Sequence, residues 1–305
     1  MLVWKANPHA VQSVAFAPTG KQLASCSIGQ EISLWELGQG TPEKEELSTK
    51  TPSGPTVRVV YSPDGRFVAR GGSNLDVWDL RNNNHLLLST NRAATGLAFS
   101  ADSQVLLTHS MRHPTARLAT TTWKILSEGW GGTRSDNDGT QFPLTCAVAH
   151  PKKPLVISAY AIHHETGWHS ILYAWDREGN IVRRFESEFQ SAHPTEIAMS
   201  PDGRFLAGVH GAFLRIWDFE SQKELACRST GRKHLKNLVF TADSRRLVTV
   251  SNDTTVRLWE TSNWTEVGGY EWKIGKLIAV AASPDGLQLA AGSAIGKMIV
   301  WDVED

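Results

Sequence analysis

The stretch Ser251-Asn252-Asp253-Thr254-Thr255-Val256-Arg257-Leu258-Trp259 contains the pattern on which the fold prediction depends. In its second half, the apolar residues Val256 and Leu258 alternate with Thr255 and Arg257 and lead up to a tryptophan, which Glu260 follows. Alternation with a period of two is typical of a half-buried β-strand. The stretch therefore predicts a strand that ends in a tryptophan and an acidic residue.

The same ending recurs along the whole chain of 305 residues. Seven tryptophans follow one another at spacings of 43, 45, 52, 42, 42 and 42 residues, and an acidic residue follows all of them except Trp123, which precedes Lys124. These tryptophans are Trp35, Trp78, Trp123, Trp175, Trp217, Trp259 and Trp301. A fixed period of about 40 residues is the mark of a repeat architecture.

A turn motif lies upstream of most of these tryptophans. Pro pre-sets the second position of such a turn, Asp tolerates the third, and Gly adopts the left-handed fourth. Short apolar strands precede the motif, which predicts a hairpin turn between two strands. The clear copies are residues 62–65, 200–203 and 283–286 (SPDG), and the degenerate copies are residues 17–20, 100–103 and 241–244.

An apolar strand, an SPDG turn and a VRLW-type strand together resemble the WD40 repeat. The resemblance covers residues 1–305 and implies an all-β, seven-bladed WD40-type β-propeller that forms a single domain. It also implies a hydrogen-bond network of Asp, His, Ser or Thr, and Trp inside each blade. In blade six, Asp253, His234, Ser251 or Thr249, and Trp259 are the candidates, and blade one has His9, Ser25 and Trp35 without the Asp.

The two ends of the chain predict how the ring closes. Only four residues follow Trp301, so the last blade lacks an outer strand, and residues 2–6 (LVWKA) have the character of one. Because closure removes open sheet edges, we expect residues 2–6 to pair with the last blade and Trp4 to be structural. Deletion of residues 1–7 is expected to lower the melting temperature sharply.

Composition restricts the classes of function. Formal net charge is zero, which argues against general nucleic-acid binding, a role that needs surplus basic residues. Cys26, Cys146 and Cys227 form no CxxC pair, and we expect buried free thiols. Without a signal peptide or an apolar run long enough to span a membrane, we expect a cytoplasmic protein with no membrane association. Residues 43–50 are polar enough to suggest one helical turn.

The resemblance implies two faces. The top face holds the loops that lead into each blade and those between its second and third strands, and the turn face holds the SPDG turns and the segments after the tryptophans. Sorted in this way, charges predict a basic top face and an acidic turn face. We therefore expect a protein-interaction scaffold, acting as a monomer or as a subunit of a larger complex, whose top face binds partner proteins, including acidic or phosphorylated segments. The expected contacts are Arg58, Arg92, Met111, Arg112, His113, Arg134, Trp168, His169, Arg232, Lys233, Lys236 and Lys276.

Three further hypotheses come from local composition. His163, His164, Glu165 and His169 lie in an insertion of blade four, and a metal-dependent propeller enzyme that uses this loop is the alternative function, although the spacing fits no established metal motif. Residues 136–139 (DNDG) resemble the start of a calcium loop but lack its downstream Glu, which favours a plain turn. The third hypothesis is that the chain is a module of a larger assembly and has no binding site of its own. No phosphate loop, dinucleotide motif or nucleophile elbow is found, so we expect neither an enzyme nor a cofactor.

Overall fold

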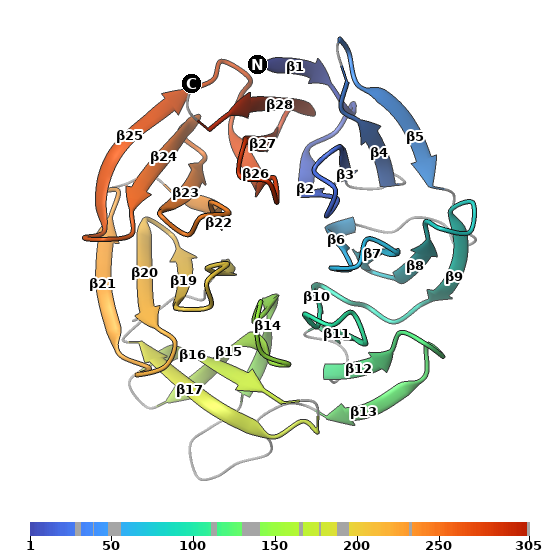
Figure 1. Ribbon diagram of the computed structural model, residues 1–305. Coiled ribbons are helices and arrows are strands. Elements are labelled where there is room, and N and C mark those ends of the chain that lie inside the picture. Colours follow the sequence, from blue (N-terminus) through green and yellow to red (C-terminus); the bar gives the residue numbers. More distant parts are fainter. Residues whose placement is uncertain are drawn as a thin grey trace.

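The protein is a ring of seven four-stranded antiparallel sheets around a central opening (Figure 1). The computed structural model describes residues 1–27, 32–38, 40–47, 56–110, 115–129, 141–164, 167–176, 178–187, 195–231 and 234–303. In this part of the chain every regular element is a strand. The prediction of an all-β, seven-bladed propeller is confirmed.

Each blade is built from four consecutive strands, except the last. The first six blades are β2(Val11–Phe16), β3(Gln22–Ser27), β4(Ile32–Glu36), β5(Glu43–Leu47); β6(Thr56–Tyr61), β7(Phe67–Gly72), β8(Leu75–Asp79), β9(His85–Thr90); β10(Gly96–Phe99), β11(Val105–His109), β12(Thr115–Ala119), β13(Ile125–Gly129); β14(Gln141–Ala149), β15(Val156–His164), β16(Gly167–Trp175), β17(Ile181–Ser187); β18(Glu196–Met199), β19(Phe205–His210), β20(Phe213–Asp218), β21(Glu224–Ser229); and β22(Leu235–Phe240), β23(Arg246–Ser251), β24(Thr255–Glu260), β25(Thr265–Glu271). Blade seven consists of β26(Leu277–Ala282), β27(Gln288–Ser293), β28(Lys297–Asp302) and β1(Leu2–Lys5).

The N-terminal strand closes the ring as expected. β1 pairs antiparallel with β28 in the register Leu2↔Val300 to Lys5↔Lys297, and it lies beside β28 at the outer edge of the blade in Figure 1. Trp4 is buried and its ring lies 5.6 Å from that of Trp35, so it packs between blades seven and one. Through Trp4, the outer strand β1 therefore contributes to the core of the ring.

The tryptophans of blades one and six make the expected hydrogen bonds inside their sheets. Trp259 Nε1 donates to Thr249 Oγ1 at 3.0 Å, and Trp35 Nε1 donates to Ser25 Oγ at 2.8 Å. The Asp–His part of the network does not form: His234 is exposed, and the carboxylate of Asp253 accepts instead from Thr255 and from Arg257. In this blade Arg257, four residues after Asp253, takes the place of the histidine as the partner of the carboxylate.

Blade three departs from the predicted alignment. Leu118 pairs with Leu106, as Trp259 pairs with Leu247 in blade six, so a leucine occupies the tryptophan position. Trp123 lies five residues later, in the turn after β12, where its backbone has a φ of 56°. The prediction that Trp123 defines blade three is therefore wrong.

Two smaller expectations are also wrong. Glu43–Leu47 forms the outer strand β5, not a helical turn, because it pairs with β4 at the edge of its blade. Cys26 and Cys146 are buried free thiols, but Cys227 is exposed on the outer strand β21.

Candidate binding surfaces around the central channel

The first strand of each blade lines the central opening, and the hairpin turn after it lies on the turn face. These inner strands are β2, β6, β10, β14, β18, β22 and β26. The seven turns on this face are residues 17–20, 62–65, 100–103, 150–153, 200–203, 241–244 and 283–286. Sequence inspection missed the turn of blade four, because His150-Pro151-Lys152-Lys153 keeps only the proline.

His150 stands where four of the other turns have serine, and it accepts two hydrogen bonds. Its Nδ1 accepts from the backbone N–H groups of Lys152 and Lys153, both at 3.1 Å. The ring packs on Phe219 and against Gly203, where a Cβ would lie 2.6 Å from it. Burial lowers the pKa of His150, with a further contribution from Lys153.

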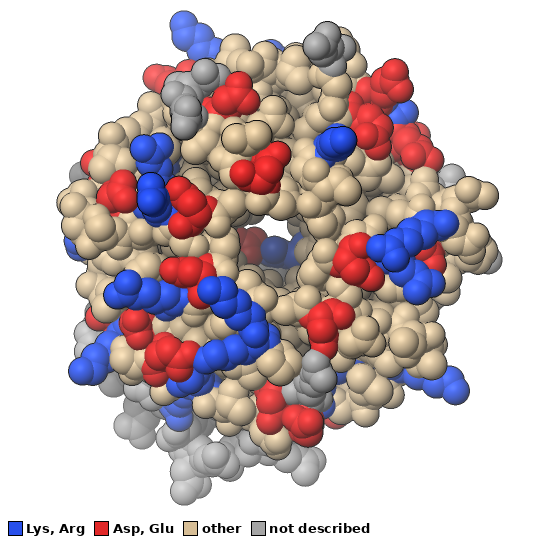
Figure 2. Space-filling view, in the orientation of Figure 1, with Lys and Arg blue, Asp and Glu red and all other residues tan. Residues whose placement is uncertain are grey.

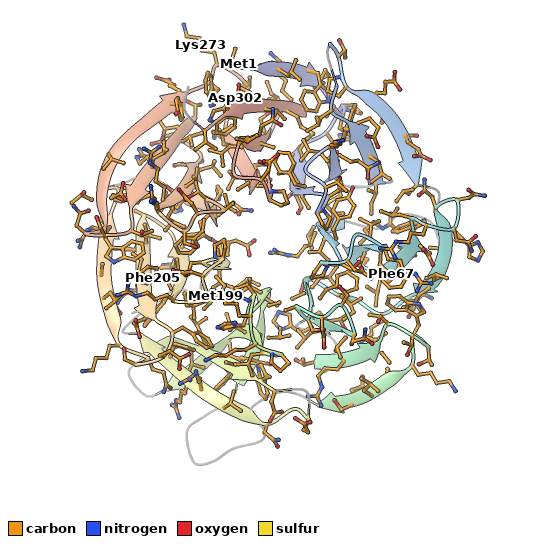
Figure 3. The ribbon with its side chains drawn as sticks, viewed as in Figure 1. Met1, Phe67, Met199, Phe205, Lys273 and Asp302 are labelled. Atoms are coloured by element: carbon orange, nitrogen blue, oxygen red, sulfur yellow. The ribbon has the colours of Figure 1, made fainter. Side chains whose placement is uncertain are left out.

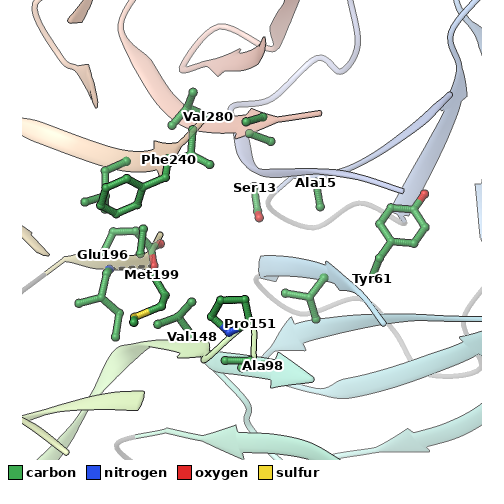
Figure 4. Close-up of a pocket in the computed structure, with 18 of the residues that line it drawn as sticks. Ser13, Ala15, Tyr61, Ala98, Val148, Pro151, Glu196, Met199, Phe240 and Val280 are labelled. Carbon is green, nitrogen blue, oxygen red and sulfur yellow. Dashed lines mark hydrogen bonds between the residues drawn. The ribbon is translucent and has the colours of Figure 1, made fainter. Parts of the chain in front are cut away.

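The channel is a mostly apolar cavity of about 660 Å³. Its wall includes the side chains of Ala15, Val148, Met199, Phe240 and Val280, one from each of five blades (Figure 4). In Figure 3 Met199 lies close to the opening, whereas Phe67 and Phe205 lie deeper in the body of the ring. A cavity of this size and lining is typical of a ligand or peptide site.

An ion pair crosses the channel near its top-face end. Arg58 Nη2 donates to Glu196 Oε2 at 2.5 Å, and the two side chains are only 17% and 8% exposed. Arg58 lies four residues before the turn of blade two, and Glu196 lies four residues before the turn of blade five. One basic and one acidic side chain are visible in the depth of the opening in Figure 2. Because both charges are removed from water, the folded ring is stable only when each charge is compensated by the other.

A buried histidine and two buried thiols lie around this ion pair. The ring of His109 covers Gly96, where a Cβ would lie 2.0 Å from Nε2. Burial, together with the positive charge of Arg58, lowers the pKa of His109 to about 3. Burial raises the pKa of Cys26 to about 12 and also raises that of Cys146. These thiols are held in the unreactive protonated form.

Four of the predicted contact residues have described side chains. Arg58 is held in the channel, and Arg92 pairs with Glu128 at 2.5 Å, so neither is a free cation. Lys236 and Lys276 are exposed at the top-face ends of the neighbouring strands β22 and β26. Within the described residues, no ion pair engages either lysine.

The other eight predicted contacts are less defined. Met111, Arg112, His113, Arg134, Arg232 and Lys233 lie outside the described residues. Trp168 and His169 lie in β16, whose backbone forms a long hairpin with β15. The insertion of blade four therefore extends the blade by lengthening strands, and β14 lengthens with it.

The register of this hairpin bears on the metal hypothesis. His163 pairs with Trp168, and His169 pairs with Ile162, so His163 and His169 are not cross-strand partners. In the part of the chain that the structure describes, no three His, Cys, Asp or Glu side chains form a group suited to a metal ion. Residues 136–139 lie outside it.

The turn face carries charges of both signs (Figure 2). Its acidic residues pair with arginines and lysines that the sequence analysis did not assign to this face. Arg66 pairs with Asp79 at 2.8 Å, and Arg183 pairs with Glu220 at 2.5 Å. The predicted acidic turn face therefore also carries basic side chains, from Arg66, which follows a turn, and from Arg183 of the outer strand β17.

Comparison with known proteins agrees with this architecture. The family model of the WD domain, G-beta repeat, matches residues 2–36 and 225–260. The chain is a WD40-repeat β-propeller. It is 22% identical to a WD repeat-containing protein 26 homolog of Arabidopsis thaliana over 99% of the chain and 50% of that protein. It is 25% identical to Striatin-4 of Mus musculus over 72% of the chain and 23% of that protein.

A third relative is the Protein LST8 homolog of Drosophila melanogaster, which is 29% identical over 41% of each chain. The chain spans half or less of the length of these relatives. WD40 propellers are typically protein-interaction scaffolds. In the described part of this chain, no helix is long and apolar enough to cross a membrane.

Proposed function

We propose that this WD40 propeller is a protein-interaction scaffold, located in the cytoplasm, whose top face binds an acidic or phosphorylated segment of a partner. The observation that carries the proposal is the pair of exposed lysines, Lys236 and Lys276, on adjacent inner strands of a closed ring. No chemical reaction is assigned to the chain.

The ring supports binding by being rigid. Closure by β1 and packing between all blades fix the ends of the inner strands before a partner arrives. A binding surface that is already ordered loses little conformational entropy on association. The loops of the top face therefore act as fixed points of contact.

The charges near the two lysines favour an acidic ligand. Asp253, which follows β23 on the same face, is already neutralised, because Arg257 Nη2 donates to its carboxylate at 2.6 Å. Although burial opposes the shift, the hydrogen bonds from Arg257 and Thr255 lower the pKa of Asp253 to about 2. Lys236 and Lys276 thus remain available to carboxylates or phosphates, to which they can donate charge-assisted hydrogen bonds.

A peptide-binding measurement tests the proposal. Fluorescent acidic peptides, with and without a phosphothreonine, would be titrated with wild type and with Lys236→Glu/Lys276→Glu. Each exposed charge contributes a modest free energy, so we expect roughly tenfold weaker binding by the double variant and a strong salt dependence. Lys124→Glu/Lys223→Glu is the matched control, because these two lysines are exposed after the third strands, on the turn face.

Equal losses in the two double variants would contradict a top-face site, as would absence of binding to every acidic peptide.

A further inference from the structure

The rim of the channel on the turn face is a ring of acidic side chains. The third position of the seven turns is occupied by five exposed aspartates, one threonine and one lysine: Asp64, Asp102, Asp202, Asp243, Asp285, Thr19 and Lys152. In Figure 2 acidic side chains surround the opening on several sides, and basic side chains adjoin it on one side. The rim therefore has a net negative charge even though the whole chain is neutral.

Each aspartate is held in place by its own turn. Asp285 Oδ1 accepts from Ser283 Oγ at 2.5 Å and from the N–H of Leu287 at 3.0 Å. Asp202 Oδ1 accepts in the same way from Ser200 and from the N–H of Arg204. The hydrogen bond from Ser283 is the main reason why the pKa of Asp285 is lowered, and the hydrogen bond from the N–H of Leu287 comes next. The negative charges are thus fixed in position before any ligand binds.

Three of the basic residues that follow the turns, Arg66, Lys153 and Arg204, pair with acids farther out on the turn face. Arg66 donates to Asp79 at 2.8 Å and Arg204 lies 3.8 Å from Asp218, and both acids are the last residues of the third strands of their blades. Lys153 and Arg183 both pair with Glu220. These ion pairs neutralise the outer part of the turn face and leave the acidic rim around an apolar opening.

The wall inside this rim is apolar. Pro63, Pro151, Pro201 and Pro284 line the mouth, and the cavity of about 660 Å³ continues to the ion pair of Arg58 with Glu196. Ala15 is partly exposed and points into the opening (Figure 4). An apolar side chain that enters here would gain burial, whereas one that carries a negative charge would meet the acidic rim.

We propose that this mouth of the channel docks a protein segment in which an apolar side chain stands between basic residues. The apolar side chain would enter the cavity, and the flanking Lys or Arg side chains would contact the aspartates of the rim. This site is independent of the top-face lysines and has the opposite charge preference. A propeller with both sites would hold two partners of opposite charge on opposite faces.

Peptide probes test this proposal with the intact chain. The first probe is a fluorescent hexapeptide with the sequence Lys-Arg-Leu-Phe-Arg-Lys, and the second replaces Leu and Phe by Ser. We expect the first to bind, and the second to bind at least roughly tenfold more weakly because it buries no apolar area. Ala15→Phe, which fills the cavity, is expected to abolish the difference between the two probes.

The contribution of the rim is tested by charge changes that keep the turns. Asp202→Asn/Asp285→Asn retains both Oδ1 acceptors, and we expect roughly threefold weaker binding for each charge removed. Asp176→Asn is the matched control, because its Oδ1 accepts from the N–H groups of Gly179 and Asn180 in a turn farther from the channel, and it should leave affinity unchanged. Lys152→Asp should strengthen binding, an effect that misfolding cannot imitate.

Three results would overturn the proposal. The first is equal binding of the two probes to wild type, which would indicate attraction by charge alone. The second is an equal effect of Asp176→Asn and the rim variants. The third is failure of Lys152→Asp to raise affinity. Should Ala15→Phe not fold, as judged from its melting curve, the rim variants still decide the question.

Discussion

The interface between blades two and three and the interface between blades five and six share the same contacts on the turn face. Trp123 meets Phe67 edge to face, with ring centroids 5.0 Å apart at 88°, and Trp264 meets Phe205 at 4.9 Å and 89°. Both tryptophans have a positive φ, 56° and 59°. Trp123 therefore corresponds to Trp264, and not to the strand tryptophan Trp259.

Hydrogen bonds between the turns repeat as well. The N–H of Asp64 donates to Ser103 Oγ at 3.0 Å, and that of Asp202 donates to Ser244 Oγ at 3.0 Å. Each serine takes the place of the turn glycine, with a φ of 59° or 61°. Its hydroxyl offsets the backbone strain by accepting from the neighbouring blade.

The two interfaces differ at the top-face end of the inner strands. Arg58 of blade two and Glu196 of blade five occupy the same position and pair with each other across the channel. In blade three Gly96 pairs with His109, where blade six has Asn237 paired with Val250. The two interfaces thus share their contacts on the turn face. The inner positions at the top-face end differ from blade to blade and make the channel asymmetric.

The largest expected effect is the loss of stability when the equivalent tryptophans of the two interfaces, Trp264 and Trp123, are replaced. Trp264 is 6% exposed, so Trp264→Ala should lower the free energy of unfolding by about 4 kcal/mol. Trp123 is only half-buried, and Trp123→Ala should cost about half as much. Urea unfolding measures both values. A larger loss at Trp123 than at Trp264 would contradict the correspondence.

The next largest effect concerns the top-face end of the inner strands, where the two interfaces differ. Glu196→Leu leaves the Arg58 charge buried without its partner and should destabilise the ring by about 3 kcal/mol. Arg58→Leu/Glu196→Leu should recover most of that loss, as should the exchange Arg58→Glu/Glu196→Arg, since the positions are equivalent. Thermal melts of the three variants check this. A double variant less stable than the single one would show that the pair does not act as a unit.

A third prediction uses pH. With a folded pKa of about 3, His109 stays neutral in the ring while the unfolded chain takes up a proton below about pH 6.5. The contribution of His109 is therefore full above pH 6.5 and is lost as the pH falls toward 3, by about 1.4 kcal/mol per pH unit. His150, whose pKa is also lowered, adds to the same trend.

Unfolding free energies measured between pH 7 and about pH 4 give this slope. His109→Val, which copies Val250 of blade six, should reduce the slope. An unchanged slope in this variant would mean that His109 is protonated in the folded ring.

The smallest effect breaks the repeated hydrogen bond between turns. Ser103→Ala and Ser244→Ala should each cost about 1 kcal/mol, because the N–H of Asp64 or Asp202 loses its acceptor. Ser→Gly at the same positions should cost less, since glycine adopts the positive φ without strain. Melting temperatures of the four variants test this. Unequal losses at Ser103 and Ser244 would show that the two interfaces are not alike.

Regular features of the fold could be predicted because they repeat. Six turns and the tryptophan spacing were sufficient for the number of blades, and the short chain end after Trp301 was sufficient for closure by β1. Blade three was misaligned because Leu118 replaces its strand tryptophan while Trp123 keeps the spacing nearly regular. The turn of blade four was missed because it begins with a histidine, His150. The ring nitrogen of His150, and not a serine hydroxyl, accepts the hydrogen bonds of this turn.

The site could be predicted less well because its contacts do not repeat. Nothing in the neighbourhood of Arg58 along the chain indicates that a residue 138 positions away neutralises it. Charge counts by face failed for another reason, since Arg66 and Arg204 lie just outside the turn motif that was counted. Lys236 and Lys276 are exposed at the top-face ends of β22 and β26, and their role in binding stays a prediction.

Simultaneous binding of two probes tests the central claim, that opposite faces of one ring hold partners of opposite charge. The hexapeptide with Leu and Phe would be titrated into the propeller already saturated with an acidic phosphopeptide, each carrying a different fluorophore. We predict one of each bound per chain, with the affinity of either unchanged by the other and lost separately in Lys236→Glu/Lys276→Glu and in Asp202→Asn/Asp285→Asn. Competition between the two peptides, or loss of both in either variant, would contradict the account.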